Sequence, residues 1–246
     1  YGCVAKEDEI AYIGRLGDIG KKHAMDKPWS DDLRGMYLQE MGALISLLPS
    51  PPASILDIGA GSGWTSCFYA LSGYQVTATD IAPEMAELAS ANAARYNVPL
   101  EVVVSDFESL PFENQFDVVI FYDCLHHAED ELLALQSAFR ALKPGGICIT
   151  LEPGSGHASS AVSVQAMKDL GVTERDMPPR LIIAASKKVG FTSAQVFARP
   201  VQPLELSSRL MPRWKTVLKL VQRLVTRSTP IALHRSQYVV LHKPSI

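Results

Sequence analysis

Short apolar runs alternate with longer segments of helical periodicity through the middle of the chain. The runs are rich in valine, isoleucine, leucine and phenylalanine, which is typical of buried strands. They lie at 54–58, 75–79, 100–104, 116–121 and 147–151. The segments 65–71, 83–96 and 130–142 between them have the spacing of amphipathic helices. This alternation predicts a doubly wound α/β fold, in which a mostly parallel sheet carries helices on both faces.

Residues before the first strand predict two helices, at 6–16 and from about 31 to 48, with a loop between them. The second helix has an apolar face on which Glu40 is the one polar residue. It ends at a proline-rich stretch, because proline cannot continue a helix. We therefore expect an N-terminal helical cap at 1–49 and an α/β domain at 50–246.

Residues after 152 begin with a stretch rich in glycine and serine. Two further helices and two strands are expected beyond it, at 163–170, 181–189, 191–200 and 237–243. The two strands are expected to pair with each other. A basic segment is inserted between them, at about 203–235.

The composition fits a globular protein that buries one core. The chain has 246 residues, of which 47% are apolar and 20% charged, and no apolar run is long enough to cross a bilayer. The four cysteines are widely spaced and form no C-x-x-C pair. Reduced thiols in a cytoplasmic protein are the simplest interpretation, and a zinc site is not expected.

The formal net charge of the chain is −3, but the charges are unevenly distributed along it. Residues 206–235 hold seven basic side chains and no acidic one. Residues 208–229 have the spacing of an amphipathic helix with one basic stripe. Such a helix could cover an anionic substrate, make peripheral contact with an anionic membrane, or expose solvated charges. Nucleic acid is a weaker interpretation, since no known nucleic-acid module accompanies the charge.

A glycine-rich loop follows the first strand. Gly59, Gly61 and Gly63 alternate with other residues, and Asp57 precedes them. Glycines allow positive φ and close approach of a ligand to the backbone. A dinucleotide-binding loop would place its third glycine at Trp64, and a carboxylate at Asp57 would repel a pyrophosphate. The loop therefore favours a cationic or amine-bearing ligand.

This loop resembles the first motif, Asp/Glu-x-Gly-x-Gly-x-Gly, of the class I S-adenosylmethionine (SAM)-dependent methyltransferases, in particular those acting on small molecules. The resemblance covers roughly residues 50–152. It implies a Rossmann-like seven-stranded sheet whose last strand is antiparallel. It also implies SAM as cofactor and S-adenosylhomocysteine (SAH) as product. Asp57 and the Gly59–Gly63 backbone, Ala60 included, would then bind the methionine part.

Polar residues at the ends of the next strands fit the rest of that cofactor. Asp80 follows the second strand and could accept both ribose hydroxyls, although it could also cap the helix at 83–96. Ile81 would flank the adenine. Asp106 would accept from the adenine amine, with Phe107 beside the base or simply in the core. Tyr122 completes the candidate cofactor residues, with packing as its simpler role.

Methyl transfer needs a base only when the acceptor is a hydroxyl or a protonated amine. His126 and His127 follow the fourth strand and Glu152 the fifth, so all three are candidate catalytic residues, with His157 as a rival base. Adjacent histidines are expected to point in different directions, so no metal site is predicted.

The sequence thus predicts a SAM-dependent methyltransferase for a small-molecule or sugar-containing acceptor. Residues 171–179 resemble methyltransferases encoded near polysaccharide-building enzymes. In the family that it resembles, a segment before the first strand often closes over cofactor or substrate. Lys21, His23, Met25 and Trp29 could serve in this way, or the segment could be an ordinary surface cap. The alternative is a non-catalytic module that keeps the fold and binds SAM or a partner chain.

Overall fold

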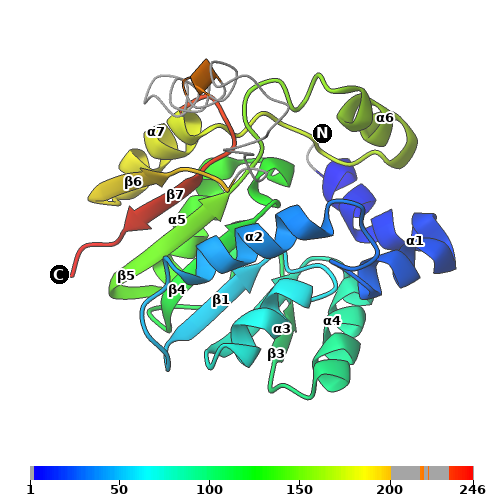
Figure 1. The fold of residues 1–246 in the computed structure, drawn as a ribbon, viewed down its shortest axis with the longest axis horizontal. Coiled ribbons are helices and arrows are strands. Elements are labelled where there is room, and N and C mark those ends of the chain that lie inside the picture. The colour runs from blue at the N-terminus through cyan, green and yellow to red at the C-terminus, as the bar shows by residue number, and fades with distance from the viewer. Residues whose placement is uncertain (1–2, 201–216, 219–220, 222–232, 246) are drawn as a thin grey trace.

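A computed structural model describes residues 3–200, 217, 218, 221 and 233–245. One seven-stranded sheet has the order β3-β2-β1-β4-β5-β7-β6 (Figure 1). The strands are β1 (Ser54–Ile58), β2 (Gln75–Asp80), β3 (Glu101–Val104), β4 (Phe116–Tyr122), β5 (Leu142–Leu151), β6 (Ser193–Phe197) and β7 (Tyr238–His242). Strands β1 to β5 are mutually parallel, and β7 runs antiparallel to both β5 and β6. The predicted fold class and the antiparallel strand are confirmed.

The helices are α1 (Cys3–Met25), α2 (Arg34–Ile45), α3 (Trp64–Leu71), α4 (Pro83–Tyr96), α5 (Glu131–Ala141), α6 (Ala161–Leu170) and α7 (Pro179–Val189), with short 3₁₀ turns η1 (Phe107–Ser109) and η2 (Leu125–His127). Among these described helices, none combines the length and apolar character needed to span a bilayer.

Two apolar layers hold the sheet between its helices. In β4, Val118 and Ile120 pack with α2 and α3, whereas Val119 and Phe121 pack with α5 and α7. Successive strand residues point to opposite faces, so a continuous apolar run such as that of β4 suits burial on both sides. The alternation of strands and helices in the sequence therefore gives helices on both faces, as predicted.

The N-terminal region differs from the expectation. The loop expected after residue 16 is wrong, because α1 continues to Met25 with a change of direction at Gly17 (φ 62°, ψ −162°). Glycine alone adopts such a backbone conformation without strain. Figure 1 shows α1 beside α6, at the end of the sheet toward which the parallel strands point. The second helix also begins later than expected, at Arg34.

Glu40, the polar residue on the apolar face of α2, is 1% exposed and paired. Its carboxylate accepts hydrogen bonds from the Nε of Arg199 and, at 2.6 Å, from the hydroxyl of Tyr122. The Tyr238 hydroxyl donates to the Glu40 carbonyl at 2.8 Å. A buried carboxylate is tolerated only with such partners. These contacts join α2 to the ends of β4 and β7.

The described helices and strands leave two predictions untested. The basic helix at 208–229 lies almost wholly outside the described residues. The division into a cap at 1–49 and a domain at 50–246 stays a prediction.

Candidate active site

The glycine loop connects β1 to α3 with three left-handed glycines. Gly59, Gly61 and Gly63 have φ values of 60°, 55° and 71°. A Cβ on Gly59 would lie 2.7 Å from the Cβ of Cys124, and one on Gly63 would lie 2.8 Å from the Cβ of Ala89. At Gly61, a Cβ would meet nothing within 4 Å. The outer two glycines thus permit close packing, while the middle one faces open space.

Asp57 lies beneath this loop and is 1% exposed. Its Oδ2 accepts hydrogen bonds from the hydroxyls of Thr65 at 2.7 Å and Ser66 at 2.5 Å. Burial raises the pKa of Asp57 to about 6, and these two hydrogen bonds offset the effect only in part. Its Oδ1 is buried without a hydrogen-bond partner among the described residues. Asp57 therefore anchors the start of α3 and keeps one acceptor atom unused.

Asp80 joins the loops that follow β1 and β2. Its Oδ2 accepts from the Gly61 N–H and its Oδ1 from the Ala82 N–H, both at 2.9 Å. Burial raises the pKa of Asp80, although these N–H groups favour the ionised form. The alternative prediction, that Asp80 caps α4, is wrong, because the N-cap residue is Ala82 and this helix has no side-chain cap. Asp80 instead accepts from the N–H of that N-cap residue.

Asp106 is in contact with α1. Its Oδ2 accepts from the ammonium of Lys6 at 2.6 Å, and its Oδ1 accepts from the Glu108 N–H at 2.9 Å. Burial by itself would lower the pKa of Lys6, but the hydrogen bonds and charges of Asp106 and Glu108 raise it above its ordinary value. Phe107 packs edge-on against Phe121, with ring centroids 6.2 Å apart. The Phe107 ring therefore packs at the edge of the hydrophobic core.

Two adjoining cavities of about 480 and 430 Å³ form one crevice at the carboxyl ends of the strands. Both are lined by Gly59, Gly61, Tyr12 and Asp123. Of the predicted cofactor residues, the first cavity is lined by Asp57, Gly59, Ala60, Gly61 and Tyr122, and the second by Gly59, Gly61, Asp80, Ile81, Asp106 and Phe107. Gly63 lines neither. Ligands bind at this edge of doubly wound sheets.

The crevice also receives α1. Lys6 and Glu9 line the second cavity, and His23 lines the first. The other residues proposed to close over a ligand, Lys21, Met25 and Trp29, line neither cavity. Lys21 instead forms an ion pair with Glu84, and Trp29 is largely exposed.

Glu152 is buried and does not line the crevice. It accepts from the backbone N–H groups of Cys124 (3.2 Å), Leu125 (2.9 Å) and His126 (3.2 Å), and from the Nδ1 of His126 at 2.8 Å. Four donors leave a carboxylate little capacity to accept a substrate proton. This geometry favours an anchoring role for Glu152, in which it fixes the loop after β4.

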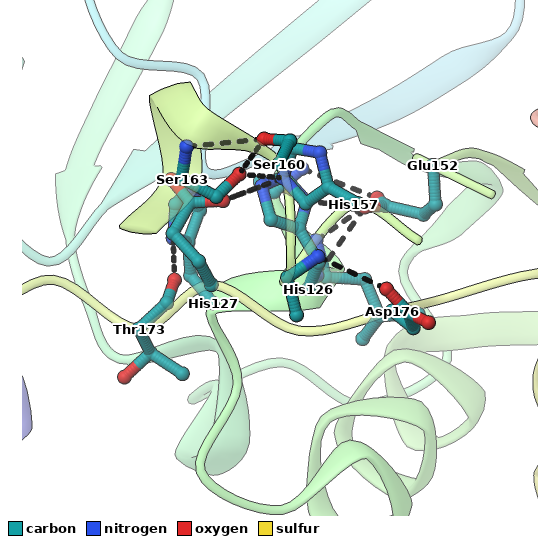
Figure 2. Close-up of polar contacts among 12 residues, drawn as sticks. His126, His127, Glu152, His157, Ser160, Ser163, Thr173 and Asp176 are labelled. Carbon is teal, nitrogen blue, oxygen red and sulfur yellow. Dashed lines mark hydrogen bonds and ion pairs between the residues drawn. The ribbon is translucent and has the colours of Figure 1, made fainter. Parts of the chain in front are cut away.

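His126 and His127 both line the crevice, in contrast to Glu152. Their ring centroids lie 4.0 Å apart, so the expectation that the two rings point in different directions is wrong. They belong to η2, and Figure 2 shows Glu152 and Thr173 holding them from different sides. The His127 Nδ1 lies 2.5 Å from the Thr173 carbonyl.

Carboxylates surround this histidine pair. Burial alone would lower the pKa of His127, but Glu9, Glu174 and the Thr173 carbonyl raise it to about 9. His157, the predicted rival base, lies 2.5 Å from Glu174 through its Nε2. The cluster therefore favours positive charge at this end of the crevice.

Several crevice residues were given no chemical role from the sequence, although Asp123 was expected at this edge of the sheet. Asp123 follows β4, lines both cavities and has φ 56°, a conformation that non-glycine residues rarely adopt. Its position at a strand end was the available signal. Lys6, Glu9 and Glu174 reach the site from α1 and from the loop between α6 and α7. No local pattern marks them, since their partners are distant in the sequence.

Residues 56–150 match the family model described as "Methyltransferase domain". The chain is 37% identical over 116 residues to the ubiquinone biosynthesis O-methyltransferase of Xanthomonas campestris pv. campestris, and 36% over 96 residues to that of Xanthomonas oryzae pv. oryzae. These matches cover 46% and 38% of this chain and 47% and 40% of the relatives. The chain thus aligns with less than half the length of these relatives.

Solved structures share the fold over more of this chain. Phosphoethanolamine N-methyltransferase 2 of Haemonchus contortus, solved in complex with SAM, gives a TM-score of 0.68 at 22% identity, covering 99% of this chain and 61% of that one. The [4+2]-cyclase SpnF gives 0.56 at 20% identity, covering 86% and 81%. At these identities the likeness establishes the fold, and the second structure is named for a different reaction.

Proposed function

We propose that this chain transfers the methyl group of SAM to a small-molecule acceptor. One observation carries the proposal: a single crevice joins the glycine loop and the carboxylates at the carboxyl ends of β1, β2 and β3 to a cluster of histidines. The first group suits recognition of an adenosyl sulfonium, and the second suits handling of an acceptor proton. The family match over 56–150 and the relatives that are methyltransferases support the same assignment.

The residues present fit SAM. Each oxygen of Asp80 accepts one backbone N–H and keeps a lone pair for a ribose hydroxyl. The open space beside Gly61 admits a ligand against the loop backbone. The unused Oδ1 of Asp57 would accept from the ligand's amine, directly or through water. Ile81 and Phe107 would flank the adenine.

Asp106 would meet the adenine amine only beside its ion pair with Lys6. One carboxylate has four acceptor positions, and the described contacts use two of them. The adenine amine and the ammonium can therefore bind together. Lys6 would then place α1 over the bound base, which supports the cap proposed for residues 1–49.

SAM, when bound, supplies an electrophilic methyl carbon on a sulfonium. The chain has to align the acceptor with that carbon and exclude water. Tyr12 and Lys27 line both cavities and cover the crevice from the N-terminal region. His126 would receive a proton from a hydroxyl or ammonium acceptor, while Glu152 holds the loop that carries it. His127, whose pKa is raised to about 9, would do so only after losing its own proton.

The acceptor class rests on the relatives. The curated relatives are named as O-methyltransferases of ubiquinone biosynthesis, and one structural relative acts on phosphoethanolamine. Both are named for small molecules. A sugar-containing acceptor, membrane contact through 208–229 and a cytoplasmic location stay predictions.

A transfer assay with methyl-labelled SAM tests the function. The panel contains phenols, carboxylic acids, amines and sugar nucleotides. We expect label in at least one acceptor class, with SAH formed in equal amount, and loss of both in Asp80→Ala. SAM binding without transfer to any acceptor would instead favour the non-catalytic binding module.

A further inference from the structure

Three potential metal ligands meet at the histidine end of the crevice. One ring nitrogen of His126, one of His127 and one carboxylate oxygen of Glu174 all lie within 4.8 Å of one another. Donor atoms around one tetrahedral zinc ion lie about 3.3 Å apart. Small side-chain rotations would bring these three atoms to that spacing, and imidazole and carboxylate are common zinc ligands.

The surroundings of His126 match those of a metal ligand. Its Nδ1 lies 2.8 Å from Glu152, whose carboxylate also accepts three backbone N–H groups. That carboxylate therefore accepts a hydrogen bond from the Nδ1–H group, which leaves the Nε2 lone pair free. The Nε2 lies 3.7 Å from an oxygen of Glu174. A histidine whose second nitrogen donates to a buried carboxylate is a recurrent arrangement in zinc sites.

The other two donors are held in a similar way. The Nδ1–H of His127 donates to the Thr173 carbonyl, which can only accept a hydrogen bond, so the Nε2 of His127 is the nitrogen left to bind a cation. The Nε2 of His157 lies 2.5 Å from Glu174 and orients its carboxylate. Figure 2 shows Thr173, Glu152 and His157 around the two central histidines.

A second set of candidate ligands, Asp123, His126 and Glu152, shares one histidine with the first. It is the weaker set, because Glu152 already accepts four hydrogen bonds and the His126 nitrogen facing it carries the proton. The set that contains Glu174 has no such conflict. It also lies next to the Glu9 carboxylate, 3.4 Å from His127, which adds negative charge.

We propose that His126, His127 and Glu174 bind one divalent transition-metal ion, with Zn²⁺ the best match to two imidazoles and one carboxylate. All three residues line the crevice, so the open coordination position of the metal ion would face the acceptor. The role of the ion rests on the proposed function: it would orient an acceptor oxygen and favour its ionised form. His126 and His127 would then act as ligands, and His157 would remain to receive a proton.

Titration of the chelator-treated full chain tests the site. We expect Zn²⁺ to bind one to one in calorimetry, and Co²⁺ to give visible absorption typical of a four- or five-coordinate site. Glu174→Gln and His127→Gln should weaken binding by more than the 10- to 100-fold typical of an outer partner. His242→Gln is the matched control, since His242 lies on β7 and contacts Gln195. It should bind as the wild type does.

Two results would overturn the metal site: no metal binding by the wild type, or binding that Glu174→Gln leaves unchanged. Circular dichroism and SAM titration of each variant show that it is folded. Because the metal titration is done without SAM, a failure here leaves the proposed cofactor site untouched. If these residues only hydrogen-bond to one another, the wild type would bind no metal.

Discussion

The packing of Gly63 against α4 is a sensitive point in the loop that carries the proposed site. In Gly63→Ala the new Cβ would lie 2.8 Å from the Cβ and 3.0 Å from the Cα of Ala89. Neither atom is at the end of a flexible side chain, so α3 or α4 must move. Overpacking of this kind costs about 1–3 kcal/mol, in addition to about 1 kcal/mol for a left-handed alanine.

Gly61→Ala is the matched control. Gly61 also has positive φ, at 55°, but its Cβ would meet nothing within 4 Å. The left-handed penalty applies to both variants, and so does the loss of unfolded-state entropy. Gly63→Ala should therefore lower the free energy of unfolding by about 1–3 kcal/mol more than Gly61→Ala.

Urea denaturation without ligand measures the difference, and Ala89→Gly completes a double-mutant cycle. The single Ala89→Gly variant should lose about 1 kcal/mol as a helix glycine. In combination with Gly63→Ala it should restore part of the packing loss, because it removes the 2.8 Å contact with the Cβ and leaves the 3.0 Å contact with the Cα. Equal stabilities for Gly61→Ala and Gly63→Ala, or an additive cycle, would refute the steric argument.

Three further predictions concern charged groups. Asp80→Ala should weaken SAM binding more than tenfold in calorimetry, because it removes the proposed ribose acceptors; unchanged affinity would contradict the assignment. Asp57 has a folded-state pKa of about 6 against an ordinary 3.8, so its contribution to stability is present below about pH 4 and is lost as pH rises through 6. Between pH 4 and pH 7 the wild type should lose about 2 kcal/mol relative to Asp57→Asn in denaturation, and parallel pH curves would contradict the shift. Arg199→Met should cost about 3–5 kcal/mol of stability by leaving Glu40 buried without its cation, and adding Glu40→Gln should recover part of it; no recovery would show that the ion pair is not the cause.

The sheet could be predicted because its signals are local. Each buried strand is a short apolar run, and each is followed by a polar residue such as Asp80 or Asp106. Parallel strands bring their carboxyl ends to one edge, so these residues meet regardless of their separation in the chain. The crevice and most of its predicted lining followed from that rule.

Contacts made across the chain could not be predicted in this way. Lys6 pairs with Asp106 a hundred positions later, and Glu174 meets His126 and His157 from a polar loop with no regular pattern. Glu40 was recognised as out of place, but its partner Arg199 is distant. The orientation of adjacent histidines also depends on the turn that carries them, and η2 brings the rings together.

The most direct measurement is a calorimetric comparison of SAH, SAM and NAD on the full chain. The proposed site predicts one-to-one binding of SAH and SAM and no heat with NAD, whose pyrophosphate would lie against the Asp57 end of the glycine loop. Binding of NAD in preference to both adenosyl compounds would contradict the central assignment.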